Sequence, residues 1–338
     1  GNFTWKPRIY WRRNQDMYLL IRDNPAAYRN LHITNKIAAE LNGSYQSKTG
    51  ITGFGIEFSK YYISSNRLGD NQREIASLFL EHRIQFFNNR IDVTPGISAS
   101  YFSDFDNQIF PGLDLGIQIS DKFRAYGNIG TSYRVPTYTN LYYVSPSTIS
   151  NPNLNTEEAF SQEVGVKFTS KHLSISLAAF NRDADNLIDY VREDISSPWQ
   201  AQNIQSVATK GYETNLEYRF FLNQLPQKFQ FGYSYLDNEV KKSEANFSQY
   251  AINSMKHQFV GNYAMEWFKN FSNSVSYRYV ERTSGVSYNI WDVNASYRLK
   301  AVELSLYANN IFNTEYVETG MVPMPKGNIL FGLKYYFK

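Results

Sequence analysis

The sequence predicts an all-β fold, a transmembrane antiparallel β-barrel that takes up the whole chain. Three observations lead to this prediction. Apolar and polar residues alternate with a period of two, short and long connections alternate, and aromatic residues make up 17% of the 338 residues. Successive residues of a strand point to opposite faces, so a period of two is typical of strands with one apolar face. No apolar run approaches the roughly 20 residues that a membrane-spanning helix needs.

The segment "EVGVKF" shows this alternation clearly. Val164 and Val166 fall on one face of the expected strand, and Glu163 and Lys167 fall on the other. A membrane barrel presents apolar residues to lipid and polar residues to its lumen, so both faces have a place in such a wall. We therefore expect the charged strand residues to face inward; they include Glu163, Lys167, Glu213, Glu217 and Arg219.

Turn signals divide the chain into about sixteen expected strands. In chain order they cover residues 8–22, 31–47, 51–63, 73–88, 90–102, 110–119, 123–133, 159–169, 172–191, 202–221, 227–240, 252–268, 271–282, 288–299, 301–312 and 326–337.

The connections between these strands alternate in length. Tight turns occur at "SKTG", "NNR", "SDK", "SKH", "FKN" and "KA", whereas residues 134–158, 192–201, 236–251 and 315–325 form long connections. Outer-membrane barrels have short periplasmic turns at one rim and long extracellular loops at the other. The count of strands places the C-terminus at the short-turn rim.

The last expected strand alternates to its end. Ile329, Phe331 and Leu333 form an apolar face that we expect to contact lipid, while Asn328 and Lys334 lie on the other face. A soluble β-sandwich or propeller also alternates. However, many of the expected strands exceed the usual five or six residues.

Aromatic residues gather near the ends of the expected strands. Tyr279, Tyr288 and Trp291 are examples. Membrane proteins place such rings at the bilayer interfaces. We therefore expect these residues to belong to an interfacial girdle.

Composition excludes several function classes. The chain has no cysteine, and its net charge of +3 is too balanced for an electrostatic nucleic-acid binder. The four histidines, His32, His82, His172 and His257, fall in four different expected strands, and no phosphate-binding loop or nucleophile elbow is present. We expect no metal site, no cofactor and no enzyme activity, although an outer-membrane hydrolase stays open as a third alternative.

Four stretches resemble TonB-dependent outer-membrane receptors. "YRVPTYTNLYY" (133–143) and "NPNLNTEEAFSQEVGVKF" (151–168) are similar to two consecutive family motifs, with Asn140 where the family often has Glu. "AQNIQSVATKGYETNLEYRF" (201–220) resembles a family strand, and "NNIFNTEY" (309–316) with "GLKYYF" (332–337) resembles the closing signature. Residues 10–35 are similar to the vitamin B12 receptor branch of Bacteroidetes.

The resemblance implies a 22-stranded barrel around an N-terminal plug, in the outer membrane of a Gram-negative bacterium. Residues 1–338 would then be the C-terminal portion of the barrel domain, without the plug. A sheet of sixteen strands would leave two edges unpaired in hydrocarbon. We therefore expect this chain to close only with strands that it lacks here.

The family implies active import of a large, scarce ligand, with cobalamin preferred and an iron siderophore or haem next. Its partners would be the TonB complex, acting through the plug, the lipid bilayer, the ligand and a surface lipoprotein. Long loops on a rigid scaffold commonly carry binding, and rings with a polar tip suit a large amphipathic ligand. The candidate ligand-binding residues are Tyr138, Asn140, Tyr142, Tyr143, Trp199, Phe247, Tyr250, Met321 and Met324. The alternative function is a passive sixteen-stranded porin, selective through its inward charges.

Overall fold

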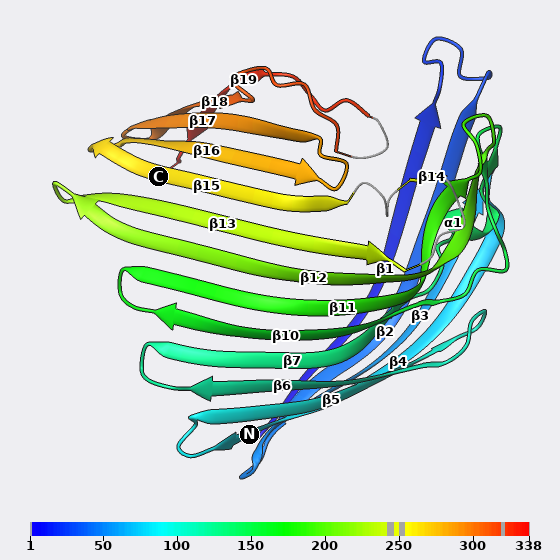
Figure 1. Cartoon of the computed structure of the whole chain (residues 1–338), viewed down its shortest axis with the longest axis horizontal. Helices are drawn as coiled ribbons and strands as arrows, with labels where there is room; N and C mark the ends of the chain where they lie inside the picture. Colours follow the sequence, from blue (N-terminus) through cyan, green and yellow to red (C-terminus); the bar gives the residue numbers. More distant parts are fainter. Residues whose placement is uncertain (1, 242–246, 250–253, 319–321, 338) are drawn as a thin grey trace.

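The computed structural model describes residues 2–241, 247–249, 254–318 and 322–337. Within them, sixteen long strands form one antiparallel sheet that curves round as an incomplete wall (Figure 1). In the described part of the chain, no helix has the length and apolar character needed to cross a membrane.

The first seven strands run consecutively along the chain. They are β1 (Phe3–Leu19), β2 (Arg29–Gln46), β3 (Gly50–Ser65), β4 (Gly69–Phe86), β5 (Ile91–Phe102), β6 (Gln108–Gln118) and β7 (Phe123–Arg134). A long connection follows, with α1 (Tyr138–Tyr142) and the two-residue strands β8 (Val144–Ser145) and β9 (Thr148–Ile149).

The remaining strands continue the same sheet. They are β10 (Glu157–Thr169), β11 (Leu173–Arg192), β12 (Trp199–Leu222), β13 (Leu225–Val240), the two-residue β14 (Phe247–Ser248), β15 (Met255–Phe268), β16 (Phe271–Arg282), β17 (Ser287–Leu299), β18 (Val302–Asn309) and β19 (Asn328–Tyr335). The sixteen long strands confirm the expected number and order.

Each long strand pairs with the next one along the chain, from β1–β2 to β18–β19. Among the described residues, β1 and β19 do not pair with each other. The sheet therefore has two open edges. This agrees with the expectation that the wall does not close on itself.

The two rims differ as the sequence predicted. Short turns join β2 to β3, β4 to β5, β6 to β7, β10 to β11, β12 to β13, β15 to β16 and β17 to β18. The opposite rim carries the long connections, including residues 135–156 and 310–327. Both chain ends lie at the short-turn rim, where the N and C marks appear in Figure 1.

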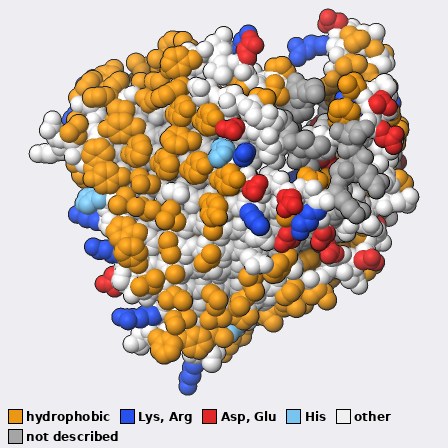
Figure 2. All heavy atoms as spheres, in the orientation of Figure 1, with side chains coloured by type: hydrophobic (Ala, Val, Ile, Leu, Met, Phe, Trp, Pro, Cys, Tyr) orange, Lys and Arg blue, Asp and Glu red, His pale blue; other side chains and the backbone are white. Residues whose placement is uncertain are grey.

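The two faces of the sheet have opposite chemistry. On the outer face, Val164 is 63% exposed and Phe331 is 85% exposed. On the inner face, Glu217 forms ion pairs with Arg219 and Lys228 at 2.6 and 3.2 Å. In Figure 2, apolar side chains cover most of the strand surface, and charged side chains gather at the left margin and toward the long loops.

Side chains crowd the inner face, where glycine is needed at Gly165. A Cβ atom there would lie 2.4 Å from the ring of Tyr126, on the neighbouring strand β7.

The last strand, β19, has the expected orientation. Its apolar face, Ile329, Phe331 and Leu333, is more than half exposed along the outer side.

The girdle prediction is wrong for Tyr288. Tyr288 is 8% exposed on the inner face, and its hydroxyl donates to Glu318 at 3.1 Å. Trp291 pairs with Tyr277 and lies an odd number of residues from Tyr288 on β17. Because faces alternate along a strand, the two rings cannot share one girdle.

The four histidines lie in or beside separate strands, as expected. Each is within hydrogen-bond distance of a neighbouring strand: His32 with Ser65, His82 with Thr52, His172 with the carbonyl of Arg219, and His257 with Tyr233. Among the described residues, no three His, Cys, Asp or Glu side chains group to hold a metal ion.

Candidate functional site

The long-loop rim carries the candidate site, and its central element is the connection of residues 135–156, which we call the mouth loop. It contains α1, β8 and β9. Leu141 and Leu154 of this loop pack with Ile188 and Ala201 in a buried apolar cluster. The mouth loop is therefore folded onto the outer ends of β11 and β12.

A capping box starts α1. The Asn140 amide donates to the Thr137 hydroxyl at 3.2 Å, and the Thr137 amide donates to Asn140 Oδ1 at 3.1 Å. This exchange satisfies backbone donors at the start of a helix that would otherwise lack partners. Asn140 also donates through Nδ2 to the Tyr190 hydroxyl at 3.3 Å. The buried Asn140 side chain thus holds the loop in shape.

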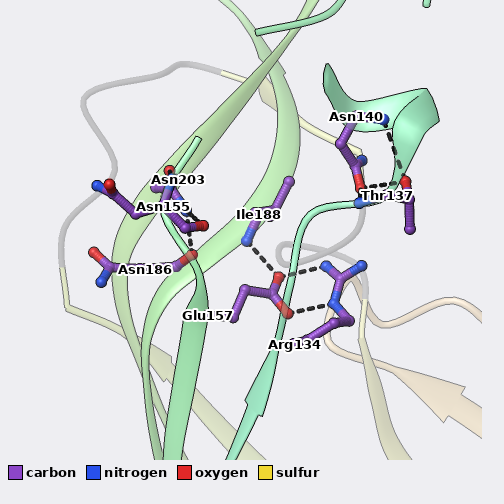
Figure 3. A network of polar contacts seen from close by, with 8 residues as sticks. All are labelled: Arg134, Thr137, Asn140, Asn155, Glu157, Asn186, Ile188 and Asn203. Carbon is purple, nitrogen blue, oxygen red and sulfur yellow. Dashed lines mark hydrogen bonds and ion pairs between the residues drawn. The ribbon is translucent and has the colours of Figure 1, made fainter. Parts of the chain in front are cut away.

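A polar network anchors both ends of the mouth loop (Figure 3). Arg134 at the end of β7 forms a two-pronged ion pair with Glu157 at the start of β10. Glu157 also accepts from the Ile188 amide at 2.6 Å. A bidentate Arg–carboxylate pair is among the stronger polar contacts in proteins. Three strands are thereby joined at one carboxylate.

Asn203 on β12 makes a second anchor in the same network (Figure 3). Its Nδ2 donates to the carbonyls of Asn155 and Asn186 at 3.1 and 2.5 Å, and its Oδ1 accepts from the Asn155 amide at 2.8 Å. Asn155, near the end of the mouth loop, is thus tied to β12.

Arg73 on β4 holds the mouth loop from the other side. Its Nε lies 2.8 Å from both carboxylate oxygens of Asp104, and its Nη2 donates to the Pro136 carbonyl at 3.1 Å. The guanidinium also lies 4.9 and 5.3 Å from the ring centres of Phe105 and Tyr138. Such cation–π contacts favour a fixed ring position.

Tyr138 and Tyr142 form a ring pair on α1, with centroids 6.3 Å apart. Burial raises the pKa of the Tyr138 hydroxyl to about 12. That hydroxyl has no hydrogen-bond partner among the described residues. Tyr142 is 37% exposed. The pair therefore presents an aromatic surface through Tyr142, while the Tyr138 hydroxyl is buried.

Tyr143 reaches the connection between β1 and β2. Its hydroxyl lies 2.9 Å from the Tyr28 hydroxyl and accepts from Asn30 Nδ2 at 3.2 Å. The mouth loop begins at the end of β7, and this contact brings it to the start of β2. The loop therefore reaches across the outer ends of the strands between them. Tyr143 is therefore engaged in holding the loop, as Asn140 is.

Trp199 and Phe247 flank one guanidinium. The Arg192 guanidinium lies 4.3 Å from the Trp199 ring centre and 5.6 Å from that of Phe247. Trp199 also pairs with Thr148 of β9, so this group adjoins the mouth loop. Met324 lies elsewhere, where its amide donates to the Tyr316 carbonyl at 2.9 Å. Tyr250 and Met321 lie outside the described residues.

A cavity of about 610 Å³ lies on the inner face beside the mouth loop. Arg134, Arg182, Tyr190, Thr209 and Asn238 are among its lining residues. Arginine, hydroxyl and amide groups can bind a polar ligand through hydrogen bonds. Asn140, one of the residues predicted to bind the ligand, also lines this cavity. The strand residues were not predicted, although the two-residue period places Arg182 and Thr209 on the inner face.

Residues 2–311 match the family model described as "TonB dependent receptor-like, beta-barrel". The chain belongs to this family of TonB-dependent receptors. It is thus an outer-membrane β-barrel segment of a Gram-negative bacterium, in a family of receptors and not of enzymes. This agrees with the resemblance found in the motifs.

Several individual proteins are similar to this TonB-dependent receptor chain. The vitamin B12 transporter BtuB of Photobacterium profundum is 25% identical over 298 residues, which are 84% of this chain and 47% of that protein. The ferric enterobactin receptor PfeA of Pseudomonas aeruginosa has a TM-score of 0.76 at 14% identity, covering 98% of this chain and 59% of the other.

The copper transporter OprC has a TM-score of 0.79 at 14% identity, covering 98% of this chain and 64% of the other. At such identities the structural likeness establishes the fold only. The chain spans about half the length of the curated BtuB relative that it matches.

Proposed function

We propose that the complete protein imports a large, scarce ligand across the outer membrane in a TonB-dependent manner. In this proposal residues 1–338 form part of the barrel wall and its outer mouth, and a plug and the remaining strands of a 22-stranded barrel lie outside this chain. The observation that carries the proposal is the position of the mouth loop. It is folded inward and anchored to β2, β4, β11 and β12 beside a polar cavity.

The open sheet argues against the passive porin. A pore of sixteen strands would need β1 and β19 to pair, and these strands do not pair among the described residues. Unpaired strand edges are costly in hydrocarbon, so the wall needs further strands. An incomplete wall of this kind supports a larger barrel.

Cobalamin is the ligand that we propose first, because curated relatives are named as vitamin B12 transporters. An iron siderophore or haem comes next, since the similar structures include a ferric enterobactin receptor. The partners would be the TonB complex, through the plug, and a surface lipoprotein above the mouth. The exposed rings of Tyr142 and Phe247 suit a large amphipathic ligand.

Equilibrium binding to the full-length protein tests the ligand class. Cyanocobalamin should bind, and Tyr142→Ala and Trp199→Ala should each weaken binding several-fold, because ring burial contributes strongly to such sites. Tyr335→Ala, on the outer face near the opposite rim, is the matched control and should leave affinity unchanged. Tight binding of a ferric chelate with none of cyanocobalamin would move the proposal to siderophores.

A further inference from the structure

A groove runs across the outer face of β2–β5. The proposed import of a ligand through the lumen does not involve this groove. One row across these strands joins Ala39, Phe58, Ala76 and Tyr101 as register neighbours. Small and large side chains therefore alternate across the wall. Because side chains stand out from a sheet, the alanines form the floor of a groove and the rings form its sides.

Two adjoining hollows make up this groove. One has a volume of about 450 Å³ and the other about 350 Å³, and both are lined by Phe58, Ala76 and Tyr101. Phe58 and Tyr101 are 57% and 54% exposed. The groove lies on the outer face, away from the lumen. A molecule that occupies this groove therefore comes from the bilayer and not from the lumen of the barrel.

Lys60 and Glu74 lie at the outer end of the groove. Lys60 Nζ is 2.9 Å from Glu74 Oε1, and both side chains remain substantially exposed, at 43% and 59%. Both residues line the first hollow. A lysine ammonium has three N–H donors. Since Glu74 accepts one of them, two remain for another acceptor.

The height of Lys60 in the wall points to headgroups rather than acyl chains. It lies about ten residues beyond the short-turn end of β3, and a tilted strand needs roughly 9 to 11 residues to cross the hydrocarbon. Trp11 stands in the same row, through Ile37, and tryptophan concentrates at bilayer interfaces. Because the long-loop rim faces outward, this level belongs to the outer leaflet.

We propose that this groove binds one phosphorylated glycolipid of the outer leaflet. An acyl chain lies against Ala39 and Ala76 between the larger side chains, and a headgroup phosphate accepts hydrogen bonds from Lys60. The match of an apolar groove with a cation at headgroup level supports this occupant. Lysine is well suited to bind phosphate as a compact charge. The site rests on the family's membrane location and not on the imported ligand.

Native mass spectrometry of the delipidated full-length protein tests the site. Bisphosphorylated lipid A is titrated beside its dephosphorylated form and beside phosphatidylethanolamine. Lys60→Gln should weaken lipid A binding about five-fold, as expected for one lysine at a charged lipid surface. Glu74→Gln should strengthen it, because the competing carboxylate is removed. Ala76→Leu should abolish the high-affinity molecule by filling the groove.

Matched controls are Lys48→Gln, in the turn at the opposite rim of the same hairpin, and Ala179→Leu, on the outer face of β11. Neither should change lipid A binding. The proposal is overturned if Lys60→Gln and Ala76→Leu behave like these controls. It is equally overturned if dephosphorylated lipid A or phosphatidylethanolamine binds as tightly as lipid A.

Discussion

Glu157 is the residue on which most anchoring contacts of the mouth loop converge. Its carboxylate receives both the Arg134 guanidinium and the Ile188 amide, and the residue is 8% exposed. Removing one partner from a buried polar contact leaves the others unsatisfied, at a cost of about 1–3 kcal/mol. The sequence placed Glu157 in a connection, so its role could not be predicted from the two-residue period.

We predict that Glu157→Ala loosens the mouth loop while the barrel wall stays folded. Limited proteolysis of the full-length protein should cleave residues 135–156 faster in this variant than in the wild type. Glu158→Ala is the matched control, because Glu158 is exposed on the opposite face of the same strand. Equal cleavage rates for the two variants would contradict the anchoring role.

Asp194 gives a prediction on pH. Hydrogen bonds from Ser196 and Ser197 to its carboxylate lower the pKa of Asp194 to about 2. Because this folded-state pKa lies below the ordinary value near 3.8, the turn's extra stability is present above pH 3.8. It is lost as the pH falls through about 2.

Hydrogen exchange measures this turn directly. After correction for intrinsic rates, the Ser196 and Ser197 amides should keep nearly the same protection at pH 7 and pH 3, because pH 3 lies between the lowered pKa and the ordinary one. Asp194→Ala should remove that protection at both values. Loss of most of the wild-type protection at pH 3 would show that the turn does not lower the pKa of the Asp194 carboxyl group.

At the scale of elements, strands were predictable and loop elements were not. A two-residue period persists over a whole strand, so 271–282 was expected and β16 covers Phe271–Arg282. The first strand was expected from residue 8, whereas β1 begins at Phe3 and includes Pro7. Proline lacks the N–H that a neighbouring strand would accept, so the usual sequence rules argue against a strand at that position.

The short elements of the mouth loop have no such pattern. The helix α1 has five residues, and its cap depends on Thr137 and Asn140. Its position depends on Arg73 and Tyr190, which are distant in the sequence. Contacts of this kind arise from the folded wall. The candidate rings of Tyr138 and Tyr142 could therefore be named from the sequence, but not their anchors.

Neighbouring residues of β19 provide a test of the two faces. Phe331 lies on the outer face and Leu330 on the inner face. Phe331→Arg should destabilise the full-length barrel by about 2–4 kcal/mol, because a basic side chain is costly near the bilayer midplane. Leu330→Arg should cost much less. Denaturant unfolding in lipid vesicles measures both, and equal losses would contradict the assigned faces.

At the scale of the whole molecule, the two open edges decide whether these sixteen strands can form a closed barrel. β1 and β19 each present one side that is unpaired among the described residues. The chain has no cysteine, so introduced cysteines can report on these edges. In the full-length protein, Ile9→Cys should form no disulfide with Cys introduced at Ile329, Phe331 or Leu333. Disulfides need Cα atoms within about 7 Å.

The control for this experiment is Ile9→Cys combined with Ala39→Cys. Ile9 and Ala39 are register neighbours on β1 and β2, so this pair is expected to form a disulfide. Efficient bridging between β1 and β19 would instead show a wall closed by sixteen strands.

Liposome swelling with the full-length protein tests the central claim most directly. In a plugged receptor the plug blocks the lumen to small sugars, so vesicles that contain the protein and no energy source should not swell in an isosmotic sugar solution. A sixteen-stranded pore would admit the sugar and the vesicles would swell at once. Rapid swelling of this kind would contradict the account of a TonB-dependent importer.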